Sequence, residues 1–151
     1  MSSKLDAVIA GHICLDITPA FKTVAGTKYA DIFRPGSLLV MGPAVISSGG
    51  PVSNTGLALR RLGIKVALMG KCTDDAFGHI LLERLRREAP GTEKGMGMVK
   101  GESTSYTVAL TPPGIDRMFL HCTGTNDTFA SGDINLDIVK TARLFHFGYP
   151  P

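Results

Sequence analysis

The segment 47–56 carries residue types that could hold a polar ligand. Its adjacent glycines, Gly49 and Gly50, have no Cβ, so the backbone there could approach another group closely. Asn54 follows shortly afterwards and offers both a hydrogen-bond donor and an acceptor. The pattern therefore predicts a binding turn, and the alternative is a tight strand-to-helix turn that binds nothing.

A helix is expected directly after this turn, because the run 57–62 is apolar on one side. Ser53 or Asn54 is expected to cap its start, where the first N–H groups lack internal partners. Gly63 stands where a residue just past a helix end is often glycine.

Asp16 is a second candidate. It follows the apolar segment 5–11, which reads as a buried strand of an α/β sheet. Ligands of α/β folds bind at the carboxyl ends of such strands, and a carboxylate there could accept hydrogen bonds from two vicinal hydroxyls. A purely structural role, as a turn cap, is equally compatible with this position.

The length, composition and net charge of the chain indicate one globular domain and exclude several classes of protein. The 151 residues are 44% hydrophobic and 19% charged, with a formal net charge of +3. Basic residues cluster only at Arg60–Arg61 and within 84–87, as expected for solvated helix faces. No apolar run is long enough for a bilayer, and the start of the chain lacks the form of a signal peptide. We therefore expect a cytoplasmic protein that binds neither nucleic acid nor membranes.

The cysteines and histidines give no sign of a disulfide framework or a metal site. Cys14, Cys72 and Cys122 are odd in number and far apart, so we expect reduced, buried thiols. The four histidines lack metal-ligand spacing. We assign no metal-binding residue.

The order of elements predicts an α/β fold with a mainly parallel sheet. Strands are expected at 5–11 and 64–70, each followed by a helix, the second over 80–86 and capped by Asp74 or Asp75. Residues 17–46 read as an excursion from the main sheet, with short strands at 37–41 and 44–46. Segments 104–111 and 117–122 predict a hairpin around the turn 112–116. A strand at 95–99, a helix at 134–140 and a strand at 144–148 complete the expectation.

These motifs together resemble the amino-terminal portion of the PfkB (ribokinase-like) carbohydrate kinase family. Gly49, Gly50, Asn54 and Gly63 match the family's first signature, from which Val52 and Gly56 depart. The block 73–78 is similar to its Gly-x-Asp-x-Phe-Gly element, with Thr73 where glycine is common. Residues 124–126 are similar to a Gly-x-Asn element that follows the hairpin.

The resemblance implies a ribokinase-like fold in which 1–151 is the amino-terminal part. It also implies a small β lid made of segments about 15–46 and 103–123. The reaction would be transfer of the ATP γ-phosphoryl group to a hydroxyl of a sugar or nucleoside, with Mg²⁺. Asp16, Gly49, Gly50, Asn54 and Asn126 would hold the substrate, and a homodimer would form through the lid.

The segment 127–133 looks like the family's second signature, whose last Asp is the catalytic base. Ala130 and Ser131 replace its Gly and Ala, and the segment comes far earlier than in the family. We therefore expect a loop with Asp133 as a helix N-cap, and assign no catalytic residue. The main site for ATP and Mg²⁺ is not evident, so we expect the chain alone to be inactive.

Two other interpretations remain open. The first is a non-catalytic sugar-binding or dimerisation fragment, favoured by the absence of a matching second signature. The other is a dinucleotide-binding fold, which is disfavoured because Gly11-His12-Ile13 stands where a Gly-x-Gly-x-x-Gly would follow the first strand.

Overall fold

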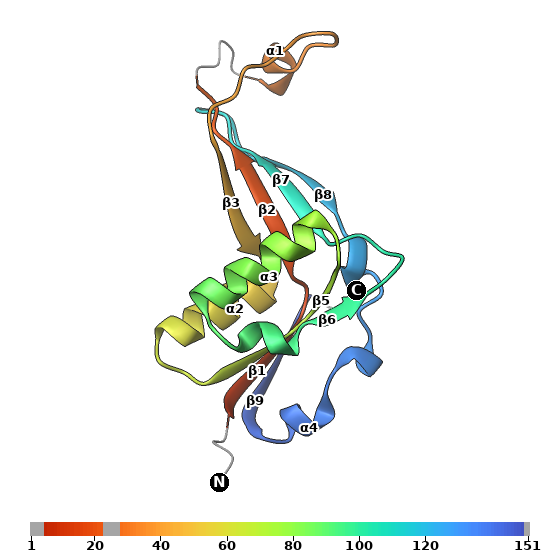
Figure 1. The fold of residues 1–151 in the computed structure, drawn as a ribbon. Helices are drawn as coiled ribbons and strands as arrows, with labels where there is room; N and C mark the ends of the chain where they lie inside the picture. The colour runs from red at the N-terminus through yellow and green to blue at the C-terminus, as the bar shows by residue number, and fades with distance from the viewer. Residues whose placement is uncertain (1–4, 23–27, 150–151) are drawn as a thin grey trace.

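The computed structural model describes residues 5–22 and 28–149. Residues 1–4, on which part of the signal-peptide expectation depends, and 23–27, within the expected lid segment, lie outside the described residues. The molecule is elongated, with a helix-covered body at one end and a sheet that extends away from it (Figure 1). No helix of the described residues is long and apolar enough to cross a membrane.

A three-stranded parallel sheet forms the centre of the body. Its order is β4 (Val66–Met69), β1 (Leu5–Gly11) and β9 (Ala142–Gly148). All three strands were expected from their apolar runs, and the α/β, ribokinase-like fold class is confirmed. β1 is buried along most of its length because strands of a parallel sheet are covered on both faces.

Two helices, α2 (Gly50–Arg61) and α3 (Ala76–Glu88), lie on the same side of this sheet (Figure 1). Their apolar faces pack with the sheet into one core that contains Ile9, Leu57, Leu68, Leu81 and Leu85. The prediction that Ser53 or Asn54 caps α2 is wrong. The helix begins earlier, with Gly49 in extended conformation as its N-cap. Proline fits the first helical turn because the N–H that it lacks would have no partner there, and Pro51 stands in that turn.

A second, four-stranded sheet extends from the body. Its order is β3 (Ala44–Gly49), β2 (Cys14–Pro19), β7 (Tyr106–Leu110) and β8 (Met118–Cys122). The expected hairpin is confirmed, since β7 and β8 pair antiparallel. The strand suggested at 37–41 is absent: Leu38 and Val40 stay 89% and 64% exposed, so this segment lacks the burial that favours a strand.

Short elements connect these layers. β5 (Lys71–Thr73) pairs with β6 (Gly97–Val99), close to the strand expected at 95–99. The others are α1 (Tyr29–Ile32), α4 (Leu136–Val139) and three turns of 3₁₀ helix: η1 (Thr92–Gly95), η2 (Gly124–Asn126) and η3 (Ser131–Asp133). α4 occupies part of the helix expected at 134–140.

Asp75 ties the start of α3 to the segment that enters β7. Its carboxylate accepts hydrogen bonds from Gly78 N at 2.7 Å, as an N-cap, and from Thr104 N at 2.8 Å. Burial raises the pKa of Asp75, but these hydrogen bonds outweigh burial and lower the pKa from 3.8 to about 2. The prediction of Asp75 as the N-cap is confirmed, and its carboxylate also joins the helix-covered body to the extended sheet.

This carboxylate makes a specific contribution to acid stability. Because its pKa is lower in the folded state, its stabilisation is present above pH about 4 and is lost as the pH falls towards about 2. We expect Asp75→Asn to be less stable at pH 7 and to lose less stability than the unchanged chain between pH 4 and 2. Urea unfolding at a series of pH values measures this difference, and parallel curves would contradict it.

Candidate functional site

The candidate residues meet where the two sheets join. β1 continues through His12 and Ile13 into β2, and β3 continues directly into α2. Antiparallel pairing sets Cys14 opposite Gly49 and Asp16 opposite Ser47. Asp16 therefore lies within β2, close to the glycine pair, although it is 33 positions from Gly49 in sequence.

Both glycines are required by what packs against them. A Cβ on Gly49 would stand 2.1 Å from Asp16 Oδ2, so only glycine leaves room for this carboxylate. Gly50 has φ +79°, and a Cβ there would stand 2.5 Å from the His12 carbonyl oxygen. That oxygen also accepts a hydrogen bond from Val52 N at 3.2 Å. Because neither glycine has a side chain, the start of α2 packs closely against the segment that leads to Asp16.

A row of polar side chains crosses the four-stranded sheet at the level of Asp16. In register, the row runs Ser47, Asp16, Thr107, His121, one residue from each strand. Side chains paired in register project from the same face of a sheet. Thr107 Oγ1 and His121 Nδ1 are hydrogen-bonded at 2.9 Å, and Cys14 Sγ donates to Asp16 Oδ1 at 3.2 Å. One face of this sheet therefore presents Asp16 among hydroxyl and imidazole groups.

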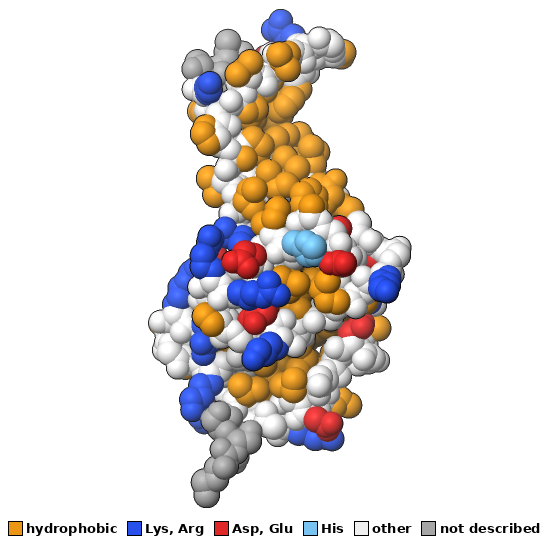
Figure 2. Space-filling model, viewed as in Figure 1, with side chains coloured by type: hydrophobic (Ala, Val, Ile, Leu, Met, Phe, Trp, Pro, Cys, Tyr) orange, Lys and Arg blue, Asp and Glu red, His pale blue; other side chains and the backbone are white. Residues whose placement is uncertain are grey.

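The adjacent row in register is apolar: Ile46, Ile17, Val108 and Leu120. Because neighbouring residues in a strand point to opposite faces, this row lies on the other side of the sheet. Figure 2 shows hydrophobic side chains gathered over this sheet, beyond the charged surface of the body. The sheet thus has a polar row with Asp16 on one face and an apolar row on the other.

His12 and Cys14 stay uncharged beside Asp16. Burial, and next the neighbouring His121, lower the pKa of His12 from 6.5, against the opposing charges of Asp16 and Asp127. The His12 ring stacks on His121, with ring centres 5.3 Å apart. Burial, and next the charge of Asp16, raise the pKa of the Cys14 thiol to about 12. These groups offer hydrogen bonds at neutral pH, and the Cys14 thiol is no nucleophile.

Asn126 is buried and already bonded at both ends of its amide. Its Oδ1 accepts from Ile13 N at 3.1 Å, and its Nδ2 donates to Ile13 O at 3.0 Å. The side chain therefore clamps the crossing between β1 and β2. By holding Ile13, Asn126 is suited to position His12 and Cys14, which flank Ile13 in sequence.

Asn54 lies elsewhere on α2. It is exposed and lines a cavity of about 210 Å³ together with Ser47 and Ser48. Asp16, Gly49 and Gly50 are not among the residues that line this cavity. The structure thus brings Asp16, Gly49 and Gly50 together, holds Asn126 behind them, and places Asn54 at a different surface.

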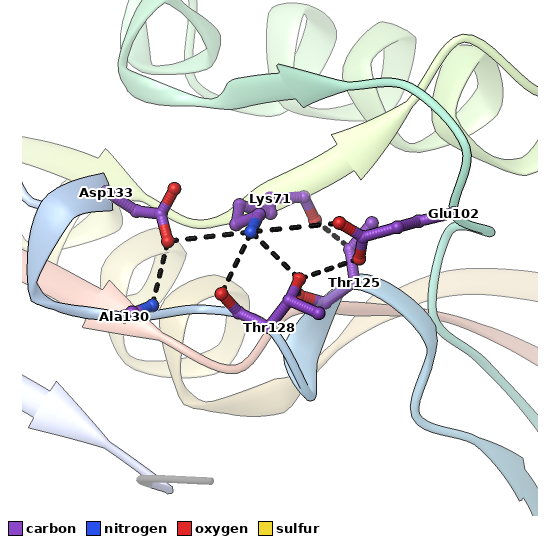
Figure 3. A network of polar contacts seen from close by, with 6 residues as sticks. All are labelled: Lys71, Glu102, Thr125, Thr128, Ala130 and Asp133. Atoms are coloured by element: carbon purple, nitrogen blue, oxygen red, sulfur yellow. Dashed lines mark hydrogen bonds and ion pairs between the residues drawn. The ribbon is translucent and has the colours of Figure 1, made fainter.

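Asp133 belongs to a network centred on the buried Lys71 (Figure 3). Lys71 Nζ donates to Thr128 O at 3.0 Å and to Thr128 Oγ1 at 2.8 Å, and lies 3.5 Å from Asp133 Oδ2 and 4.0 Å from Glu102 Oε1. The Lys71 side chain is only 7% exposed, so its charge requires these partners. The network fastens segment 124–133, which carries Asn126, to β5.

The prediction of Asp133 as the helix N-cap is wrong. Its carboxylate accepts from Ala130 N at 2.8 Å and so closes the turn η3. Asn135 caps α4 instead, since its Oδ1 accepts from Asp137 N and Ile138 N. Within 5–22 and 28–149, no three His, Cys, Asp or Glu side chains are grouped so as to hold a metal ion.

The Asn126 clamp generates a stability prediction. Asn126→Ala leaves the buried N–H and C=O of Ile13 without partners, so we expect it to lower the free energy of unfolding by about 2 to 4 kcal/mol. Urea unfolding measures this loss. Asn54→Ala, at an exposed position, is the matched control, with an expected change below about 0.5 kcal/mol. Equal small losses in both variants would contradict the clamp.

No family model matches the chain. Sequence comparison finds fructokinase-2 of Solanum lycopersicum and probable fructokinase-4 of Arabidopsis thaliana, each 31% identical over 140 residues. These alignments cover 91% of this chain and 39% of each relative. The chain therefore spans about two fifths of the length of the curated relatives that it matches.

Solved structures share the fold. A putative ribokinase II from E. coli superposes with a TM-score of 0.73 at 18% identity, over 95% of this chain and 43% of that one. A sugar kinase from Pyrococcus horikoshii in complex with ATP superposes with a TM-score of 0.69 at 24% identity, over 93% and 42%. These similarities extend across both sheets, since nearly the whole chain is covered.

Proposed function

We propose that this chain, whose fold and relatives support its membership of the PfkB carbohydrate kinase family, is the sugar-binding portion of an ATP-dependent sugar kinase. The observation that carries the proposal is the packing of the Asp16 carboxylate against Gly49, where sheet and helix meet. Because relatives are named fructokinases, fructose is the first substrate to test, followed by other sugars and nucleosides.

In this proposal Asp16 accepts hydrogen bonds from two hydroxyls of the sugar, since an ionised carboxylate is a strong double acceptor. Gly49 and Gly50 allow the sugar to approach the backbone at the start of α2. Asn126 contributes indirectly by holding Ile13, and Asn54 is proposed to contact the sugar from the neighbouring cavity, which it lines together with Ser47. His12, Thr107 and His121, which lie around Asp16, exclude water and add neutral hydrogen-bonding groups.

The phosphoryl donor would be ATP with Mg²⁺, which supplies the γ-phosphoryl group and neutralises its charge. The described residues do not fit a site for this pair, because they hold no cluster of metal ligands and because Asp133 already pairs with Lys71. We therefore assign no step of the transfer to this chain. The amino-terminal placement of 1–151 in a longer kinase belongs to the proposal, and the alternative is a non-catalytic sugar-binding or dimerisation fragment.

We further propose that a homodimer forms through the four-stranded sheet, which corresponds to the β lid expected at about 15–46 and 103–123. Large apolar side chains remain exposed on its face opposite Asp16: Ile46, Met118 and Leu120. A patch of this kind favours a protein interface. The proposed protein is cytoplasmic and binds small molecules, with no membrane or nucleic-acid partner.

The substrate proposal is tested by Asp16→Asn. Since this change removes the charge of the acceptor, we expect sugar affinity to fall about tenfold or more. Isothermal titration calorimetry of the 151-residue chain with fructose and a panel of other sugars and nucleosides measures the loss. Asp137→Asn makes the same charge change on the exposed start of α4 and is expected to leave affinity unchanged. Equal affinity in both variants, or no binding by the unchanged chain, would contradict the proposal.

A second experiment tests the role of Asp133. We expect no sugar-dependent release of ADP by the 151-residue chain with ATP and Mg²⁺, because Asp133 is held by Lys71 and Ala130 N. A coupled assay for ADP measures the turnover. Turnover that Asp133→Asn abolishes would overturn this expectation and assign the catalytic base to Asp133.

A further inference from the structure

Three aromatic rings gather beside the proposed sugar site. The His12 ring stacks on His121, with ring centres 5.3 Å apart, and the centre of the Tyr149 ring lies 6.0 Å from that of His12, with the two planes nearly perpendicular. His12 follows β1, His121 lies in β8 and Tyr149 follows β9, so the three rings come from both sheets. The sugar contacts proposed above do not use Tyr149.

The position of Tyr149 is set by the packing of the preceding residue, Gly148. Its carbonyl oxygen accepts a hydrogen bond from His12 N at 3.1 Å. A Cβ on Gly148 would stand 2.3 Å from Pro51 Cβ, and a Cβ on Gly11 would stand 2.3 Å from Gly148 O. Gly148 is therefore packed between the end of β1 and the start of α2, and Tyr149 follows directly from this point.

The backbone of Tyr149 has an unfavourable conformation. Its φ is +53°, and among the residues that the structure describes it is the one residue other than glycine with a positive φ. Such a conformation is rare for a bulky residue, and strained residues of this kind cluster at functional sites. Burial of the side chain does not explain the strain, because Tyr149 stays 72% exposed.

The surface around these rings is both accessible and chemically mixed. His121 and Tyr149 are exposed, while His12 and Asp16 are partly exposed. His12 stays uncharged, because burial and the neighbouring His121 lower its pKa. A sugar also has two kinds of surface: hydroxyls that a carboxylate can bind, and C–H groups that bury apolar area against an aromatic ring.

We propose that Tyr149 is a specificity-determining residue that forms, with His12 and His121, an aromatic wall against the C–H face of a cyclic sugar while Asp16 holds its hydroxyls. This inference rests on the proposed sugar-binding function and extends it. A ring holds its C–H groups in a fixed face, whereas an open-chain polyol must lose rotational freedom to present them. The aromatic wall therefore favours cyclic sugars over open-chain polyols that carry similar vicinal hydroxyls.

The experiment compares each cyclic sugar with its open-chain reduction product: fructose with mannitol, and glucose with sorbitol. Isothermal titration calorimetry of the 151-residue chain measures the affinities. We expect the unchanged chain to bind the cyclic member of a pair about tenfold more tightly than the polyol. Tyr149→Ala is expected to weaken binding of the cyclic sugar about tenfold and binding of the polyol by less than about twofold.

Three further variants separate the ring from the backbone. Tyr149→Phe keeps the ring and should bind the cyclic sugar within about twofold of the unchanged chain. Tyr149→Gly adopts φ +53° readily, so it should bind as weakly as Tyr149→Ala yet unfold at a higher urea concentration. The matched control is Phe145→Ala, which removes from β9 an exposed ring that stacks on Phe147 and should leave sugar affinity unchanged.

Two results would overturn the inference. One is an affinity of Tyr149→Ala for the cyclic sugar within about twofold of that of the unchanged chain, and the other is an equal loss for the sugar and its polyol. In either case, loss of sugar binding in Asp16→Asn leaves the proposed function standing. Absence of sugar binding by the unchanged chain contradicts both proposals, so the two failures are distinguishable.

Discussion

The contact on which the candidate site depends is the double hydrogen bond between the Asn126 amide and the backbone of Ile13. It holds the short crossing between the two sheets, from which Asp16 follows within a few residues. Asn126 in turn lies in a segment fastened to β5 by the buried Lys71. The position of Asp16 thus depends on Lys71 and Asn126, both of which are more than fifty positions away in sequence.

Elements specified by local patterns could be predicted from the sequence. The buried run of β1, the glycine after α2, the Asp75 cap and the β7–β8 hairpin each depend on residues that are near neighbours. The start of α2 was misplaced because Ser53 resembles a cap, yet its hydroxyl is bonded to Ser48. The role of Asp133 was predicted wrongly for a similar reason, because a short acidic side chain can either cap a helix or close a turn, and here it closes η3.

The composition of the site could be predicted only in part. Asp16 and the glycine pair stand out by type and by resemblance, whereas Thr107 and His121 join them only through strand register. The apolar–polar alternation of one strand does not determine its register with a distant strand. Thr107 and His121 could therefore not be predicted as site residues from the sequence.

The glycine pair also has a mechanical consequence. A side chain at Gly49 would collide with the Asp16 carboxylate, and one at Gly50 would collide with the His12 carbonyl oxygen, so the end of β3 and the start of α2 pack directly against the segment from His12 to Asp16. Asp16 belongs to the extended sheet, while Pro51 rests against Gly148 in the body. The glycine pair therefore sets how closely the extended sheet and the body approach each other, and a larger residue at either position would move Asp16 away from the start of α2.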